Sequence, residues 1–310
     1  MRESEIIARL RRFATDPAAR GLNDDAAVLG DLVITHDTIA EGVHYRAGDP
    51  PESVGWKLVA VNLSDLAAKG ATPAAALLSL TLSGDGAWEA AFIDGIEAAC
   101  ARYGLPLIGG DTIALPPGAP RVLGMTAIGR AGSKVPARSG GKAGDRLWLV
   151  GAVGESAAGL ARLKHDEAAT GALVEAYRRP VPLLTAGRAL APYAGAMLDI
   201  SDGLLIDTLR LAEASGRSAA IDLGTVRLSP DFVAERGDSL AARLFAATGG
   251  DDYALLAAMP PEVDPATLAL PSGTLIACIG TLEPGPAALR LSHRGQAVAL
   301  PPRLGHEHHG

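Results

Sequence analysis

Short apolar runs that suit buried strands alternate along the chain with longer stretches that have the spacing of helices. In the first part, we expect strands at residues 32–35, 75–82, 105–108 and 122–128, and helices at 54–69 and 88–103. In the second part, we expect strands at residues 147–150, 196–200, 253–258 and 275–279, and helices at 156–163 and 204–214. This alternation predicts a mixed α/β (α+β) fold in which helices cover the faces of the sheets.

A break in this pattern divides the chain into two parts. Residues 132–144, with the sequence GSKVPARSGGKAG, lose the periodicity and gather glycine, proline and basic side chains. With 310 residues the chain also exceeds the usual size of a single domain, so two units with separate cores are expected. We therefore predict an N-terminal domain over residues 1–136 and a C-terminal domain over residues 137–310.

Charge and hydropathy limit the partners of the chain. The formal net charge is −7, so the chain has no basic surface expected of a nucleic-acid-binding protein. No stretch reaches the roughly 18 consecutive apolar residues of a membrane span, and the N-terminal segment MRESEIIARLRRFA carries acidic residues and spaces its apolar residues on one helical face, unlike the apolar run of a signal peptide. The cysteines, Cys100 and Cys278, are far apart and suit a reducing compartment. We therefore expect a cytoplasmic protein with no nucleic-acid or membrane partner.

Aspartates at the ends of predicted strands are the main functional signal. Six of them stand at strand ends or at turns into helices: Asp25, Asp37, Asp111, Asp199, Asp202 and Asp251. Any one of them, or Ser201, is open to a plainer interpretation as a turn or helix-capping residue. Together they predict a cleft lined by carboxylates, and a cluster of oxygen ligands suits Mg²⁺, whereas zinc would favour cysteine and histidine.

The predicted helix at 54–69 carries a polar stripe on an otherwise apolar element. Asn62, Asp65 and Lys69 are spaced so that they share one face of the helix. One interpretation is that Lys69 pairs with Asp65 at the surface. The other is that the stripe faces inward toward partners that satisfy it, because a buried polar group without partners is costly.

The common nucleotide-binding motifs do not occur. The chain has no G-x-x-x-x-G-K-[ST] sequence, and GGKAG at residues 140–144 lacks the first glycine and the hydroxyl residue of a P-loop. The segment LWLVGAVGES fails the G-x-G-x-x-G spacing of a dinucleotide-binding turn. A P-loop enzyme is therefore excluded as a motif match, and a dinucleotide-dependent dehydrogenase is disfavoured.

Seven segments, taken in order, resemble the successive signatures of thiamine-monophosphate kinases: NDDAAVL, THDTIAEGVHY, AVNLSDLAAKGATP, IGGDT, ARSGGKAGD, LDISDGLL and GGDDYAL. The resemblance covers about residues 21–256. It implies the two-domain aminoimidazole-ribonucleotide-synthetase-like fold, whose subunits pair through their N-terminal sheets and bind ATP beside that interface. It also implies a homodimer with ATP and thiamine monophosphate as substrates and several Mg²⁺ ions as cofactors.

The resemblance assigns roles to individual residues. By similarity, the magnesium ligands are Asp25, Thr35, His36, Asp37, Asp65, Asp111, Asp199 and Asp202. The positions around ATP are Gly110, Asp111, Arg138 and Ser201, and those around the acceptor are His44, Asp251 and His306. The chain departs from the family pattern in Asp251, where glutamate is usual, in His306, where an aromatic ring is usual, and in Asn23 and His36.

The implied chemistry suits the residue types. The acceptor is itself a phosphate and already an anionic nucleophile, so no covalent intermediate and no strong general base are needed. Repulsion is the obstacle, because two unit charges about 4 Å apart repel by roughly 4 kcal/mol at an effective dielectric constant of about 20. Aspartate-bound Mg²⁺ ions between the two substrates, helped by Arg138, would offset that repulsion and align a direct in-line transfer.

Three alternatives stay open at this point. An aminoimidazole-ribonucleotide synthetase or a selenophosphate synthetase would share the fold, ATP and metal, although no cysteine precedes Cys100 to act as the selenophosphate enzyme's nucleophile. The chain also lacks the C-terminal cysteine motif of the related hydrogenase-maturation protein. A non-catalytic protein that binds nucleotide or metal on the same scaffold is the third alternative.

Overall fold

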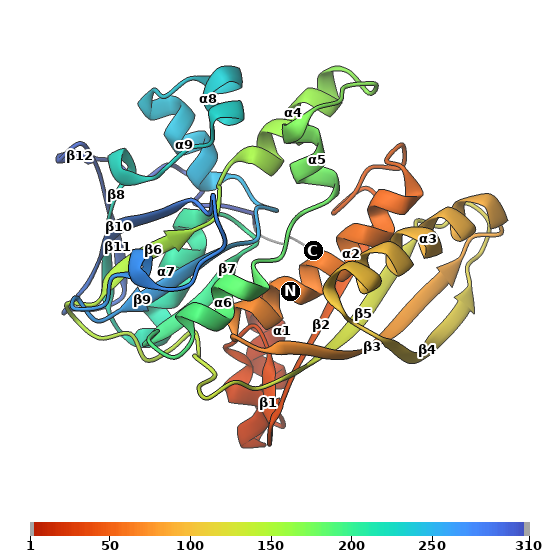
Figure 1. Cartoon of the computed structure of the whole chain (residues 1–310), viewed down its shortest axis with the longest axis horizontal. Helices are drawn as coiled ribbons and strands as arrows, with labels where there is room; N and C mark the ends of the chain where they lie inside the picture. The colour runs from red at the N-terminus through yellow and green to blue at the C-terminus, as the bar shows by residue number, and fades with distance from the viewer. Residues whose placement is uncertain (1–2, 307–310) are drawn as a thin grey trace.

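The computed structural model describes residues 3–306 and contains two sheets with a long helix between them (Figure 1). In this part of the chain, five strands form the first sheet, in the order β1 (Ala27–Leu29), β2 (Leu32–Ala40), β5 (Val122–Arg130), β3 (Thr72–Leu82) and β4 (Leu107–Ala114). Strands β3 and β4 run parallel, and the other neighbours are antiparallel. The parallel pair is joined by the crossover helix α3 (Gly86–Tyr103), as parallel pairing requires.

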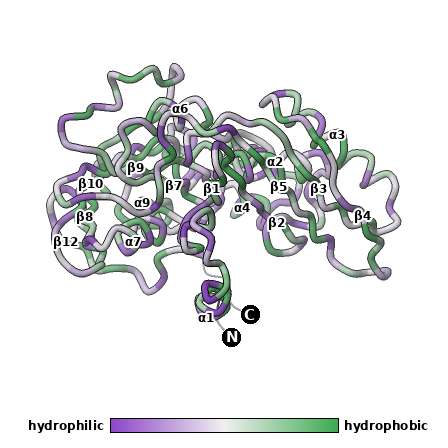
Figure 2. Tube along the Cα trace, turned by 90° about the horizontal axis from the view of Figure 1, so that it is seen from below, coloured by the Kyte–Doolittle hydropathy of each residue, from purple (hydrophilic) through white to green (hydrophobic). Residues whose placement is uncertain are grey.

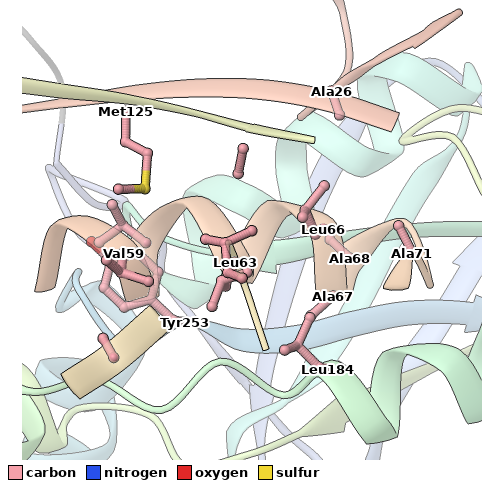
Figure 3. Packing of buried hydrophobic residues seen from close by; sticks show 14 of the residues in the cluster. Ala26, Val59, Leu63, Leu66, Ala67, Ala68, Ala71, Met125, Leu184 and Tyr253 are labelled. Atoms are coloured by element: carbon pink, nitrogen blue, oxygen red, sulfur yellow. The ribbon is translucent and has the colours of Figure 1, made fainter. Parts of the chain in front are cut away.

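Helix α2 (Pro51–Ala68) is the central element of the molecule. It packs against β2 and β5 of the first sheet on one side and against α6 (Leu184–Leu190) and β7 (Ala196–Ile200) on the other. Figure 3 shows Met125 above this helix and Tyr253 and Leu184 below it. Because α2 is covered on all sides, nearly all of its residues are buried, and most of them are apolar.

Helices α2 and α3 approach each other closely through two glycines. A Cβ atom at Gly95 would lie 2.0 Å from the carbonyl oxygen of Glu52, and one at Gly55 would lie 2.2 Å from that of Phe92. Only glycine fits at these two positions without moving the helices apart. The two glycines therefore fix the close packing of α2 against α3.

The second sheet contains seven strands of the described chain and has its own core. Its order is β12 (Gln296–Val298), β11 (Ala288–His293), β8 (Ser218–Asp222), β10 (Ile276–Glu283), β6 (Arg146–Val150), β9 (Ala254–Met259) and β7. All residues of β7 and β9 are buried, which accounts for their apolar sequences, interrupted only by Asp199 in β7. Helix α7 (Leu204–Ser215) packs against β7, β8 and β11.

Shorter helices complete the structure. They are α1 (Glu3–Leu10), α4 (Glu155–His165), α5 (Ala172–Arg178), α8 (Pro230–Arg236) and α9 (Leu240–Thr248), with 3₁₀ turns at Pro17–Leu22, Leu223–Thr225 and Pro265–Thr267. Helix α1 projects from the body of the molecule (Figure 2). Among residues 3–306, no helix combines the length and the apolar character that crossing a membrane requires.

The structure confirms the predicted mixed α/β fold. Every strand and helix expected from the periodicity is present, and most are longer than predicted; β2, for example, continues from residue 35 to Ala40. The strand expected at 105–108 begins only at Leu107, because Leu105 is a buried residue of the preceding turn. Residues 131–145 link the last strand of the first sheet to the first strand of the second, and the boundary near Pro136 stays a prediction.

Candidate active site

A cavity of about 310 Å³ lies between the two halves of the molecule. Its wall is built by the end of β2 and the following loop, by α2 and α4, and by the loops around residues 201–202 and 250–253. Six of the residues predicted for the site line it: Asp37, His44, Ser201, Asp202, Asp251 and His306. The structure thus brings together side chains that are more than 200 residues apart in the sequence.

One end of the cavity adjoins a group of buried carboxylates held by hydroxyl and amide groups. Asp37 lies near the end of β2, and its backbone N–H donates to the side-chain oxygen of Asn62 at 3.0 Å. The Thr35 hydroxyl donates to the carboxylate of Asp65 on α2. These bonds fix the carboxylates on β2 and α2 relative to each other.

Asp199 joins this group from the second sheet. It lies in β7, and its Oδ2 accepts a hydrogen bond of 2.6 Å from the hydroxyl of Ser64 on α2. The contact crosses from the N-terminal half to the C-terminal half. Docking of the second sheet against α2 therefore completes the carboxylate group.

Burial and mutual repulsion raise the proton affinity of these carboxylates. Burial, together with the charges of Asp25 and Asp202, raises the pKa of Asp37 to about 6. Burial and the charge of Asp25 raise the pKa of Asp199 to about 8, although the hydrogen bond from Ser64 opposes this. Burial, followed by the charges of Asp37 and Asp199, raises the pKa of Asp65 well above its usual value. A bound cation would relieve this repulsion.

Three cations hold Asp24 and Asp25: Lys69, Arg138 and Arg20, whose Nη1 lies 2.6 Å from Asp24 Oδ2. Lys69 Nζ lies 2.5 Å from Asp24 Oδ1 and 2.8 Å from Asp25 Oδ2, and it donates to the Met197 carbonyl at 2.9 Å. Arg138 contacts the other oxygen of Asp25. Burial raises the pKa of Asp25, but Lys69 and Arg138 more than offset that effect, so the pKa lies below its usual value.

These contacts decide between the two interpretations of the polar stripe on α2. Lys69 is completely buried, so the interpretation as a surface pair with Asp65 is wrong. The lysine reaches past the end of α2 to the aspartates before β1 instead. The stripe faces inward because partners there satisfy each of its polar groups.

Asp202 belongs to a second charged group, at the start of α7. Arg210 Nη1 lies 2.5 Å from Asp202 Oδ2 and 2.8 Å from Asp207 Oδ1. Asp207 Oδ2 accepts from the backbone N–H groups of Asp202 at 3.1 Å and Gly203 at 3.2 Å. The interpretation of Ser201 or Asp202 as the helix cap is therefore wrong, because Asp207 binds these N–H groups from within the helix and leaves the Asp202 carboxylate facing the cavity.

The lining of the cavity also holds the residues predicted for the acceptor. Asp251 Oδ2 lies 2.7 Å from Nζ of Lys57 on α2, and Asp251 Oδ1 accepts from the Tyr253 hydroxyl at 3.0 Å. His44 Nδ1 accepts from the backbone N–H of Ala40 at 3.0 Å, which orients its ring. The His306 N–H donates to the Asp202 carbonyl at 2.8 Å, which places His306 at the cavity, whereas residues 307–310 of the tail lie outside the described part of the chain.

Three predicted residues do not join this constellation within one chain. Gly110 and Asp111 lie on β4, an exposed edge strand, and β3 and β5 separate it from β2. The exposed ring of His36 lies on the opposite face of β2 from Thr35 and Asp37, with Nδ1 2.9 Å from the Thr126 hydroxyl. The assignments of Gly110 and Asp111 to ATP and metal, and of His36 to metal, stay predictions.

The residues around the cavity fit Mg²⁺. The donors are oxygen atoms, and Asp25 Oδ2 is buried without a hydrogen bond from any described residue, although its ion pair with Lys69 partly compensates. Within residues 3–306, no three carboxylates or imidazoles already stand around a single point as ligands of one ion. This suits Mg²⁺, which commonly takes only one or two carboxylates and completes its shell with water and substrate phosphates.

Comparison with known proteins places the chain in a family. Residues 23–131 match the N-terminal domain and residues 142–289 the C-terminal domain of AIR synthase related protein. The chain therefore belongs to the AIR synthase related proteins, which confirms the predicted fold. It is 37% identical to the thiamine-monophosphate kinase of Caulobacter vibrioides, over 99% of this chain and 90% of the relative. Within the wider family, the chain belongs to the thiamine-monophosphate kinases.

Two further comparisons support this placement. The thiamine-monophosphate kinase of Salmonella typhimurium is 36% identical over 90% of this chain and 89% of the relative. The structure of AaThiL complexed with AMPPCP and TMP superposes with a TM-score of 0.84 at 28% identity, covering 98% of this chain and 97% of that chain. Kinases of one substrate class thus share both the sequence and the fold of this protein.

Proposed function

We propose that this chain transfers the γ-phosphoryl group of ATP directly, in line, onto the phosphate of thiamine monophosphate, giving thiamine diphosphate and ADP. The cavity between the two halves carries this proposal, because carboxylates such as Asp37 and Asp202 line it together with the hydrogen-bonded pair Asp251 and Tyr253. The ATP analogue and TMP bound by AaThiL support the same pair of substrates.

Five carboxylates would share several Mg²⁺ ions, with one or two carboxylates on each ion: Asp25, Asp37, Asp65, Asp199 and Asp202. Bound Mg²⁺ would supply positive charge that offsets the repulsion between the phosphates of the two substrates. The protein's own part is to hold the carboxylates in place, and a bound cation would lower their raised pKa values. Asn62 and Ser64 hold two of them through their bonds to the Asp37 backbone and the Asp199 carboxylate.

The proposed mechanism needs no covalent intermediate. The acceptor phosphate is the nucleophile, so the chain has to align it with ATP and exclude water. Arg138 lies beside Asp25 with its side chain 25% exposed, which leaves part of the guanidinium available to a phosphate oxygen. Ser201, which lines the cavity beside Asp202, is the second polar residue proposed for the ATP side.

We also propose a homodimer formed through the first sheet. All eight residues of β4 are exposed, including Leu107 at 49%, Ile108 at 63% and Ile113 at 54%. A long apolar edge strand of this kind invites pairing with another strand. Pairing with the partner would cover β4 and bring Gly110 and Asp111 to a shared interface. Sedimentation of the chain would test this, since a stable monomer with full activity contradicts the proposal.

We place the protein in the cytoplasm. Both Cys100 and Cys278 are free thiols that are half-buried, as expected in a reducing compartment. Localisation of the tagged chain in its native cell would test this proposal.

A coupled assay tests the function directly. Thiamine, thiamine monophosphate and aminoimidazole-ribonucleotide precursors are offered separately with ATP and Mg²⁺, and ADP release is followed. We expect turnover with thiamine monophosphate, no turnover with thiamine, and loss of turnover on chelation of the metal. Turnover with an aminoimidazole precursor would instead favour a synthetase, and ATP binding without turnover of any acceptor would favour a non-catalytic protein.

A further inference from the structure

Lys57 is a charged residue in the middle of the buried helix α2, and its side chain is only 2% exposed. Its Nζ lies 2.7 Å from Asp251 Oδ2 and donates to the His44 carbonyl oxygen at 2.9 Å. The ammonium also lies over the Tyr177 ring, 4.2 Å from the ring centre. One buried cation therefore holds Asp251 and His44, two of the three residues predicted from the sequence for the acceptor; the third is His306.

Asp251 is fixed from its other side as well. Its Oδ1 accepts from the Tyr253 hydroxyl at 3.0 Å, and its backbone N–H donates to the Ser201 carbonyl at 2.7 Å. Asp251 and Tyr253 both have a left-handed backbone, with φ of 67° and 53°. Non-glycine residues keep this conformation only where their surroundings impose it, and they do so most often at functional sites.

The Asp251 carboxylate still faces the cavity. Its side chain is 27% exposed, whereas that of its partner Lys57 is sealed behind it. A carboxylate oxygen has two lone pairs, so Lys57 and Tyr253 leave acceptor capacity on both oxygens. The amino group on the pyrimidine ring of thiamine is a hydrogen-bond donor, and the remaining lone pairs of the Asp251 carboxylate would accept from it.

We propose that Lys57 is a positioning residue that sets the affinity for the acceptor. It acts by holding the Asp251 carboxylate and the His44 carbonyl in place behind the cavity wall, and it does not touch the reacting phosphates. This inference rests on the proposed function, because it assumes that thiamine monophosphate occupies this wall. Burying an ammonium group costs free energy unless it is paired. Lys57 therefore depends on Asp251 and the His44 carbonyl as partners, and it fixes both in turn.

A different role must be separated from this one. Lys57 lies on the N-terminal half and Asp251 on the C-terminal half, so the pair could act only as a tie between the halves. Lys134 offers a control for a cation that crosses between the halves away from the cavity: its side chain is exposed, and its Nζ donates to the Ala194 carbonyl at 2.5 Å. A role as a structural tie alone should lower the Tm of Lys57→Met and raise the KM values for both substrates alike.

The test is a double-substitution cycle with Lys57→Met, Asp251→Asn and both together, with Lys134→Met as the control. Hydrogen bonds to charged groups contribute enough to change an affinity by about ten- to a hundredfold. We expect Lys57→Met to raise the KM for thiamine monophosphate by at least about tenfold, with the KM for ATP within about twofold. The KM of the double variant for thiamine monophosphate should exceed that of the more impaired single variant by no more than about threefold, because both substitutions remove the same interaction.

A second readout covers variants that lose turnover. Calorimetric titration of thiamine monophosphate, with Mg²⁺ and a non-hydrolysable ATP analogue present, should show the same loss of affinity. If Lys57→Met does not fold, Asp251→Asn retains the lysine and should alone raise the acceptor KM. The inference is overturned if the acceptor KM is unchanged in the folded variants, if the ATP KM rises equally, or if the single effects multiply in the double variant. Absence of turnover in the unsubstituted chain would instead refute the proposed function.

Discussion

The raised pKa of Asp199 predicts how the stability of the metal-free protein depends on pH. Burial and the neighbouring charges raise its folded-state pKa from 3.8 to about 8. The folded protein therefore binds more protons than the unfolded chain between these two values. The stabilising contribution is fully present below pH 3.8 and is lost as the pH rises toward about 8.

The magnitude follows from the linkage between protons and folding. A single group with this shift lowers the free energy of unfolding by about 1.4 kcal/mol for each pH unit within the window. For a chain of 310 residues, that corresponds to a fall in Tm of roughly 2 °C per pH unit. Asp37, whose pKa burial raises to about 6, adds to the slope only in the lower part of the window.

Thermal denaturation in the presence of a chelator, between about pH 5 and pH 8, measures this slope. Asp199→Asn keeps the size of the side chain and an oxygen for Ser64, and it should remove about 1.4 kcal/mol per pH unit from the slope. Asp222→Asn is the control: although burial raises the pKa of Asp222, backbone N–H groups such as that of Gly224 lower it overall, so Asp222 does not titrate in this range. A metal-free Tm that stays level or rises with pH, or an unchanged slope in Asp199→Asn, would refute the reasoning.

Three further predictions concern single residues. Asp37→Asn should remove nearly all kinase activity while the Tm of the metal-free protein stays equal or rises, because burial and like charges raise the pKa of Asp37; near-normal turnover would contradict its role at the metal. Lys69→Met should lower the free energy of unfolding by about 1–3 kcal/mol in chemical denaturation, because Asp24 and Asp25 lose the buried cation that they share and keep only Arg20 and Arg138 as partners; a loss under about 1 kcal/mol would show that water enters instead. His306→Tyr should lower the KM for thiamine monophosphate about two- to tenfold, since a larger ring offers more stacking area, and equal KM values in both proteins would remove His306 from the site.

The sequence predicted the long, periodic elements and the positions of the carboxylates. The strand ending near Asp37 and the helix carrying Asp65 are recognisable because apolar residues recur at fixed spacing and a polar residue then interrupts them. Helices such as α5 and α8, each with seven residues, were not predicted, because two turns are too short for a clear period. Helix α8 is bounded by local signals instead, with Ser229 capping its start before Pro230 and Gly237 at its end.

The cations of the site were harder to predict than the anions. Lys57 and Arg210 were not assigned to the site, and Lys69 had two interpretations, because each pairs with a carboxylate whose position depends on the folded chain. Lys57 and Asp251 are 194 residues apart in the sequence. A usable signal did exist for Lys57, since an ammonium within an apolar helix must find a partner, but the sequence does not say which one.

Helix α2 explains why core and active site cannot be separated in this protein. Its apolar residues fill the space between the two sheets, and its polar residues reach from the same helix to both halves of the cavity. Ser64 holds Asp199 of the second sheet, Lys57 holds Asp251, and Asn62 holds Asp37 of the first sheet. Because the bonds to Asp199 and Asp251 need the second half docked on α2, the carboxylate group and the acceptor wall form together, and a substitution that loosens this packing should weaken both.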